Sequence, residues 1–172
     1  YNRMPVELFP PAAIRAAVER YHLGPRRTRI FNHSINATGY CRMRYMSSWA
    51  AEIDAICNAY NVLVVQSAGN ISVSGGIPYL GIQDHLVAGR NYPDYLYESS
   101  CRVANPGQSL QALTVGSVAY GANEAPPWRS FAQEPGHPSA FTRSGFGIWN
   151  VIKPEIVERG GDAIRTNAGD IQ

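Results

Sequence analysis

The sequence contains almost no lysine and few charged residues of any kind. Lys153 is the only lysine among 172 residues, charged residues make up 16% of the chain, and the formal net charge is +2. A net charge this small does not indicate a nucleic-acid partner, and the arginine clusters at 26–29 and 42–44 are typical of a solvated face. The low charge content predicts a surface rich in loops, or the exposure of surface that is normally buried.

Cysteine is also scarce. The chain has 3 cysteines, Cys41, Cys57 and Cys101, and no CxxC spacing. An odd count leaves at least one free thiol. Cys57 lies on a predicted helix face and is expected to be a small core residue, while a disulfide between Cys41 and Cys101 stays open. The pattern predicts no zinc site, and we expect no metal and no cofactor.

Long apolar runs and phosphate-binding signatures are absent as well. No run reaches the roughly 20 apolar residues that span a bilayer, so no membrane partner is expected. No secretory signal is visible, and the chain begins at Tyr1 rather than at methionine. The loop at residues 69–76 is rich in small residues and could bind an anion, but it lacks both the GxGxxG pattern and a Walker lysine.

The central part of the chain reads as a strand, a helix and a second strand. Within residues 48–60, Trp49, Ile53, Ile56 and Tyr60 form one apolar stripe, which predicts an amphipathic helix with Ser47 or Ser48 as its N-cap. The apolar, β-branched run at residues 62–65 predicts a strand covered on both faces. With a further strand at 29–35, this order predicts parallel pairing.

The flanking regions add one more helix and several shorter elements. Proline and helical spacing predict a helix at residues 11–22, and residues 110–120 predict a strand. Residues 67–109 read as irregular, with a short helix near 94–100, and residues 121–139 read as loop. Short strands are expected at 141–147 and 152–158. The helix at 48–60 is expected to pack on a sheet formed by residues 30–35, 62–66 and 112–118.

The most informative loop follows the apolar strand directly. It reads Ser67-Ala68-Gly69-Asn70. Functional loops of parallel sheets lie at the carboxyl ends of strands, and small residues let another backbone approach closely. The Asn70 amide could stabilise a developing oxyanion, although an asparagine in a left-handed turn would explain the same residue.

Several blocks together resemble the subtilase family. Residues 62–70 are similar to the strand and loop that end in the oxyanion asparagine of that family. Residues 30–35 resemble the strand that lines the substrate cleft, and residues 113–118 resemble a later strand with a Val-Gly-Ala-Val pattern. Residues 141–145 and 152–155 resemble a Phe-Ser-x-x-Gly turn and a Lys-Pro-Asp strand. The blocks occur in the family's order over residues 29–162, and residues 71–100 fit poorly and are interpreted as an insertion.

The chain also departs from the subtilase pattern. The motifs that carry the catalytic aspartate, histidine and serine in this family do not occur in the sequence. Truncation at both ends would account for all three. The histidines His22, His33, His85 and His137 lie outside such motifs, and no serine lies in a nucleophile-elbow sequence.

The resemblance implies an α/β fold with three layers, in which a mostly parallel sheet is flanked by helices. Residues 1–172 would be a single partial catalytic domain of a serine endopeptidase. It implies that Asn70 is the oxyanion donor and that the substrate cleft is walled by Ser34, Ile35, Asn36, Ser67, Ala68 and Gly69.

The resemblance also predicts the partners and the activity of the chain. A peptide or protein substrate is the expected partner, the chain alone is expected to be inactive, and it is expected to self-associate. Two alternatives stay open, a subtilase-like module that binds without catalysis and an anion- or nucleotide-binding domain using the 69–76 loop.

Overall fold

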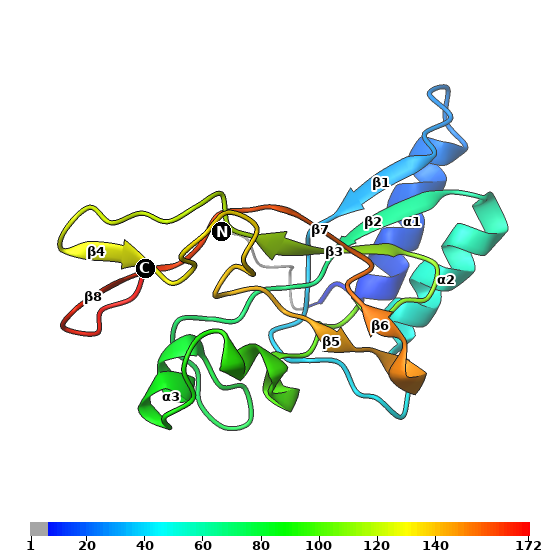
Figure 1. Ribbon diagram of the computed structural model, residues 1–172. Helices are drawn as coiled ribbons and strands as arrows, with labels where there is room; N and C mark the ends of the chain where they lie inside the picture. The colour runs from blue at the N-terminus through cyan, green and yellow to red at the C-terminus, as the bar shows by residue number, and fades with distance from the viewer. Residues whose placement is uncertain (1–6) are drawn as a thin grey trace.

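A parallel sheet of four strands forms the centre of the fold. The computed structural model describes residues 7–172. The strands are β1 (Ile30–His33), β2 (Leu63–Ser67), β3 (Leu113–Val118) and β7 (Ile156–Arg159), in the spatial order β1-β2-β3-β7 (Figure 1). Each neighbouring pair is parallel. The predicted parallel sheet, flanked by helices in an α/β fold, is therefore confirmed.

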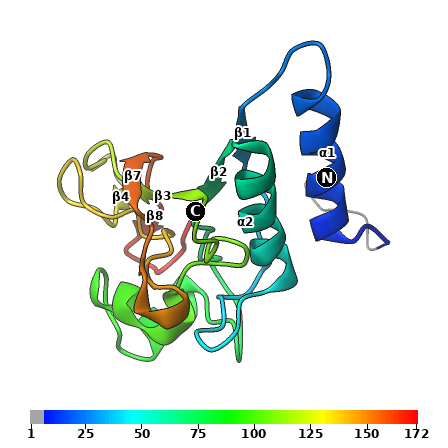
Figure 2. The same cartoon turned by 90° about the vertical axis from the view of Figure 1, so that its right-hand side faces the viewer.

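Two helices lie on one side of β1 and β2. They are α1 (Pro10–His22) and α2 (Ser48–Tyr60), and α2 lies between the sheet and α1 (Figure 2). Ser47 is the N-cap of α2, since its hydroxyl accepts a hydrogen bond from the Ala50 amide at 3.0 Å. The helix ends at Asn61, which takes a left-handed conformation with φ +49°. Both predicted helices and the predicted cap are confirmed.

The first hydrophobic core fills the space between these two helices and the sheet. It joins buried apolar side chains of α1 and α2 to those at the starts of β2 and β3: Ile14, Val18, Trp49, Ile53, Ile56, Cys57, Val62, Val64 and Ala112. Cys57 is buried here, as predicted. This core anchors the sheet and holds the carboxyl ends of β1 and β2 in place.

The expectation that residues 62–65 are covered on both faces is wrong. Val64 is fully buried, but Leu63 is 38% exposed and Val65 is half-buried. Because α1 and α2 cover only one face of the sheet at this point, side chains of β2 alternate between the core and the opposite face.

Residues 71–100 contain more regular structure than the sequence predicted. They carry helix α3 (Ile82–Val87) and the 3₁₀ turn η1 (Asp94–Tyr97), followed by η2 (Ser99–Cys101). The short helix expected near residues 94–100 is thus a pair of 3₁₀ turns, and α3 was not predicted. A second core joins this segment to later parts of the chain, through Ile71, Ile82, Tyr95, Leu96, Cys101, Phe131, Ala140 and Ala163.

Apart from β7, the strands in the last third of the chain form short antiparallel pairs outside the parallel sheet. β4 (Trp128–Ser130) pairs with β8 (Ile164–Thr166), and β5 (Gly145–Phe146) pairs with β6 (Ile152–Lys153), with the 3₁₀ turn η3 (Ile148–Asn150) between the latter two (Figure 1). Because β4 lies within residues 121–139, the prediction of a continuous loop there is wrong.

Two expectations concern cysteines and membranes. All three cysteines are free and buried, so Cys41 and Cys101 do not form a disulfide. Within residues 7–172, no helix has the length and apolar content needed to cross a bilayer.

Candidate functional site

The two loops singled out in the sequence meet at one edge of the sheet. β1 and β2 are parallel neighbours, with His33 beside Gln66, so the residues that follow each strand leave the sheet side by side. They enclose an open hollow of about 360 Å³, lined by Ser34, Asn36, Ala37, Ser67, Gly69 and Asn70. We call this hollow the cleft.

The structure thus brings together most of the predicted site residues. Ser34, Asn36, Ser67, Gly69 and Asn70 line the cleft, whereas Ile35 and Ala68 do not. Ile35 is 45% exposed and Ala68 is buried beneath the loop. Ala37 is a lining residue that the sequence did not indicate. An alanine in a loop carries no chemical signal, so only the structure could reveal it.

A chain of side-chain hydrogen bonds joins the two walls of the cleft. The Asn36 amide nitrogen donates to the Ser67 hydroxyl at 2.5 Å and to the Ser67 carbonyl at 3.3 Å. The amide nitrogen of Gln66, a fully buried side chain, donates to Asn36 Oδ1 at 2.9 Å. Because these contacts satisfy buried polar groups, they fix the spacing of the walls.

His33 completes this chain of hydrogen bonds. Its Nδ1 lies 2.6 Å from Gln66 Oε1. Since an amide oxygen can only accept, His33 carries its proton on Nδ1 and donates. Burial lowers the pKa of His33, which favours this neutral form. His33 therefore supports the wall of the cleft.

Backbone contacts hold the loop that carries Asn70. Gly69 has φ +89°, and a Cβ there would lie 2.6 Å from the Ala104 Cβ, so this position requires glycine. Asn70 pairs with Thr142 in an isolated antiparallel bridge. The Ala68 amide donates to the Val115 carbonyl at 2.9 Å.

The side chain of Asn70 is presented without a partner. Asn70 is exposed and lines the cleft. Its amide makes no hydrogen bond to any of residues 7–172. A rigid backbone therefore presents a donor to whatever occupies the cleft.

Arg143 holds the loop that carries Asn70 in place. Its side chain is 2% exposed. Its guanidinium donates to the carbonyls of Asn70 at 3.0 Å, Ser100 at 2.8 Å, Arg102 at 3.1 Å and Thr38 at 3.3 Å. Burial lowers the pKa of Arg143. No local sequence pattern indicates this role, because the carbonyls come from distant segments.

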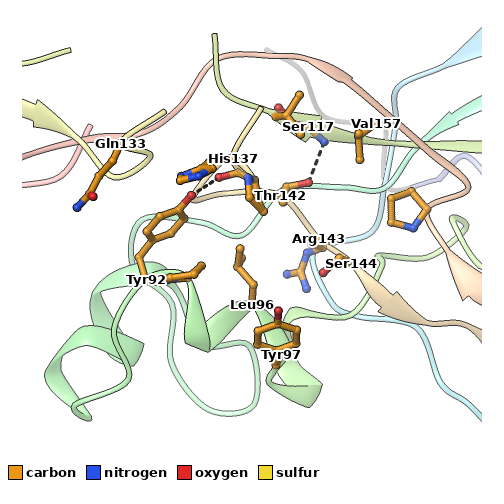
Figure 3. Close-up of a pocket in the computed structure, with 14 residues that line it drawn as sticks. Tyr92, Leu96, Tyr97, Ser117, Gln133, His137, Thr142, Arg143, Ser144 and Val157 are labelled. Carbon is orange, nitrogen blue, oxygen red and sulfur yellow. Dashed lines mark hydrogen bonds between the residues drawn. The ribbon is translucent and has the colours of Figure 1, made fainter. Parts of the chain in front are cut away.

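A larger hollow of about 500 Å³ has Arg143 in its lining (Figure 3). Tyr92 crosses one end of it and donates to the Pro138 carbonyl at 2.6 Å. Burial, with a smaller effect from Asp162, raises the pKa of Tyr92 to about 12, so its hydroxyl remains a donor. The lining is mostly apolar and aromatic and includes Tyr92, Leu96, Tyr97, Ser117, His137 and Val157.

One histidine contacts a serine, but the arrangement is unsuited to base catalysis. Ser100 Oγ lies 3.3 Å from Nε2 of His85, a fully buried side chain. Arg90 donates to His85 Nδ1 at 3.0 Å, so the ring proton lies on Nε2 and that atom cannot accept the serine proton. A catalytic histidine needs a carboxylate at Nδ1 instead.

The other histidines form no serine–histidine–carboxylate arrangement within residues 7–172. His137 Nε2 lies 3.8 Å from Glu134 Oε2, and no serine hydroxyl is hydrogen-bonded to its ring. His22 contacts the Thr28 carbonyl, and His33 contacts Gln66.

The 69–76 loop is also poorly suited to phosphate. The Asp84 carboxylate accepts hydrogen bonds from the Gly75 amide at 2.9 Å and the Gly81 amide at 2.8 Å. These amides already bind an anion of the chain itself. A phosphate would have to displace Asp84 and would meet its negative charge.

Comparison with known proteins agrees with this geometry. Residues 10–171 match the subtilase, or peptidase S8, family, a longer span than residues 29–162, which carry the resemblance in the sequence. An uncharacterized protein, y4bN, of Sinorhizobium fredii is 32% identical over 125 residues, which are 69% of this chain and 27% of that relative. The chain thus spans about a quarter of the length of this relative. The family match covers nearly all of the chain, and the chain belongs to the subtilase family.

Proposed function

We propose that this chain forms the substrate cleft and the oxyanion donor of a serine endopeptidase. The observation that carries the proposal is the Asn70 amide, exposed at the carboxyl end of β2 and without a hydrogen-bond partner among residues 7–172. The buried Arg143 and the bridge to Thr142 hold its backbone. A preorganised donor of this kind is what stabilisation of a tetrahedral intermediate requires.

The proposed mechanism follows from where charge develops. Attack by a serine on a peptide carbonyl moves negative charge onto the carbonyl oxygen. The Asn70 amide donates to that oxygen, and it contributes to rate because the bond strengthens as the charge grows. Ser34, Ile35 and Asn36 extend the edge of β1 beside the substrate backbone. Ser67 and Gly69 line the facing wall, and the buried Ala68 lies between them in the chain.

Three variants of Asn70 in the full-length protein test this role. Asn70→Ala and Asn70→Leu both remove the donor, and we expect kcat to fall by about 10²–10³ with KM nearly unchanged. That magnitude is the known effect of removing the corresponding subtilisin asparagine, and we take it from that case. Asn70→Gly is the control for backbone shape, because glycine adopts turn conformations readily. A kcat close to wild type in Asn70→Gly would contradict the assignment.

We also propose that the 172-residue chain alone hydrolyses no peptide bond. Oxyanion stabilisation and binding leave only a small residual rate when nucleophile and base are absent. Incubation with casein and fluorogenic peptides, with and without a serine-directed fluorophosphonate, tests this. Hydrolysis that the reagent abolishes would reveal a triad within the chain.

A binding module without catalytic activity is the second candidate function. It is favoured by the lack of a serine–histidine–carboxylate arrangement in residues 7–172. Fluorophosphonate labelling of the full-length protein separates the two candidates. Covalent labelling supports the peptidase, whereas an unlabelled protein that still binds peptides supports the binding module.

A further inference from the structure

A second open hollow adjoins the cleft. It has a volume of about 410 Å³, and its lining includes Ala37, Tyr40, Arg42, Tyr45, Ser48 and Tyr79. Ala37 lines both this hollow and the cleft. A peptide that lies along residues 34–36 therefore passes the mouth of this side pocket. We propose that the side pocket binds an acidic side chain of the peptide, an inference that rests on the proposed function.

Backbone pairing makes the floor of the side pocket rigid. The Ala37 amide donates to the Asn105 carbonyl at 2.7 Å, and the Cys41 amide donates to the Val103 carbonyl at 2.8 Å. Between them, Tyr40 pairs with Ala104 in an antiparallel bridge. The backbone of the loop after β1 is therefore hydrogen-bonded to residues 103–105. A pocket built on paired backbone keeps its shape before a ligand arrives.

Buried polar side chains hold the opposite wall. Ser47 donates to Asn105 Oδ1. With its amide oriented to satisfy both neighbours, the buried Gln108 donates to the Arg42 carbonyl at 2.9 Å and accepts from the Ser47 amide at 2.7 Å. These contacts fix the backbone of Arg42, the cationic residue of the lining.

The 71–100 segment contributes one side of the pocket. The ring of Tyr79 lies directly on Gly39, where a Cβ would come within 2.3 Å of the ring. Tyr79 also lies 6.0 Å from Tyr40, with the rings edge to face. The segment interpreted as an insertion thus completes the side pocket, which gives that segment a role in recognition.

The lining of the side pocket includes one cationic residue and no acidic one. Arg42 lines it, and the Arg102 guanidinium lies 5.0 Å from the Tyr40 ring centroid. Arg44 is exposed on the same loop. No aspartate or glutamate lines the pocket, and within residues 7–172 none of these three arginines forms an ion pair. The Arg102 Nε is buried without a hydrogen-bond partner in that same part of the chain.

This chemistry selects a carboxylate on a flexible side chain. Guanidinium groups bind carboxylates through paired, charge-assisted hydrogen bonds. Tyrosine and serine hydroxyls in the lining add further donors. Because the pocket opens beside the cleft, a glutamate of the bound peptide can enter it while the backbone stays along residues 34–36.

Peptide binding to the full-length Asn70→Ala variant tests the inference without depending on turnover. The probes are labelled peptides that carry glutamate or glutamine at each position in turn, measured by fluorescence polarisation. At one position, glutamate should bind about two- to fivefold more tightly than glutamine, the strength of an exposed ion pair. The preference should shrink at high salt.

Arginine variants show whether the side pocket causes the preference. Arg42→Gln should remove most of the glutamate preference, and Arg42→Lys should retain part of it. Arg26→Gln is the matched control, because Arg26 is also exposed but precedes β1, at the far end of that strand from the pocket. Peptides that bind without a glutamate preference, or a preference unchanged in Arg42→Gln, would overturn the inference.

The outcomes also separate this inference from the proposed function. If no peptide binds, both the side pocket and the cleft are wrongly assigned. A glutamate preference that depends on Arg42, together with a kcat unaffected by Asn70→Ala, would leave the side pocket standing and refute the oxyanion role. If Asn70→Ala lowers kcat as expected but no peptide shows a glutamate preference, the side pocket alone is refuted.

Discussion

Arg143 is a buried cation whose partners in residues 7–172 are carbonyl oxygens rather than a carboxylate. Its guanidinium contacts the carbonyls of Thr38, Asn70, Ser100 and Arg102. Burying a charge is unfavourable unless hydrogen bonds replace its hydration. Four such bonds do so here, and they reinforce segments that backbone hydrogen bonds already join, such as Arg143 N–H to the Gly69 carbonyl and Ser144 N–H to the Cys101 carbonyl. Arg143 therefore contributes both to stability and to the position of Asn70.

Removal of Arg143 should be strongly destabilising. In Arg143→Met, these carbonyls lose their donor while the volume is kept, and we expect the free energy of unfolding to fall by about 3 kcal/mol. Urea denaturation measures this, with the exposed Arg26→Met as the control, expected within about 0.5 kcal/mol of wild type. A loss for Arg143→Met no larger than that of the control would show that the carbonyls find other donors.

Residues of the site differ in how far the sequence could predict them. Asn70 and its glycine were predictable because a short motif after an apolar strand has a local physical meaning. Gln66, Ala37 and Arg143 were not, since their roles depend on partners far along the chain. No local pattern distinguishes an arginine that contacts distant carbonyls from one on the surface.

Helix α3 and the turns after it enclose a histidine cluster with no part in the cleft. His85 accepts a hydrogen bond from Arg90 at Nδ1, lies 3.4 Å from Cys101 Sγ through Nε2, and stacks on Tyr95. Burial, and then the nearby Arg90 charge, lower the pKa of His85, while Glu98 and Asp84 oppose this effect. A proton added at Nδ1 would face the Arg90 N–H and break the cluster.

Acid should therefore destabilise this element. The folded-state pKa of His85 lies below its ordinary value of 6.5, so the unfolded chain binds the proton first. The contribution of His85 to the free energy of unfolding is fully present above about pH 6.5. It is lost as the pH falls from there through the folded-state pKa. His33 contributes with the same sign. His85→Gln should reduce the slope of unfolding free energy against pH by up to ~1.4 kcal/mol per pH unit.

Denaturation at pH 7.5 to 5 measures the slope, with His137→Gln as the matched control on a more exposed histidine. Hydrogen-exchange protection factors of residues 82–101 should fall in acid before those of α2. A slope equal in wild type and His85→Gln would assign the acid response to other groups.

At the level of elements, the sequence predicted regular structure best where periodicity is local. The apolar residues of α2 recur with the period of a helix, and the short β-branched run at β2 is typical of a strand. β4 was hidden in a proline- and glycine-rich stretch because it exists only by pairing with β8, much later in the chain. Helix α3 is a single short segment and carries too few apolar positions to show a period.

At the scale of the whole molecule, one face of the parallel sheet is partly exposed to solvent. Register places Ile30, Leu63 and Ile156 on the face opposite α1 and α2, and they are 67%, 38% and 46% exposed. β1 pairs only with β2 among the described strands, so its outer edge offers unpaired backbone groups. Apolar area and an open edge both favour association with another chain.

Self-association of the 172-residue chain through this face is therefore the expected behaviour. Leu63→Lys and Ile30→Lys place a charge on the open face, and we expect each to shift the chain towards monomer in sedimentation velocity. Ile77→Lys is the matched control, because Ile77 is 94% exposed and lies in the 71–100 segment, outside the strands of the sheet. We expect Ile77→Lys to leave association unchanged, since the driving force is burial of the sheet face and not general hydrophobicity. A wild-type chain that sediments as a monomer at high concentration would refute the prediction, and an equal effect of all three variants would place the contact elsewhere.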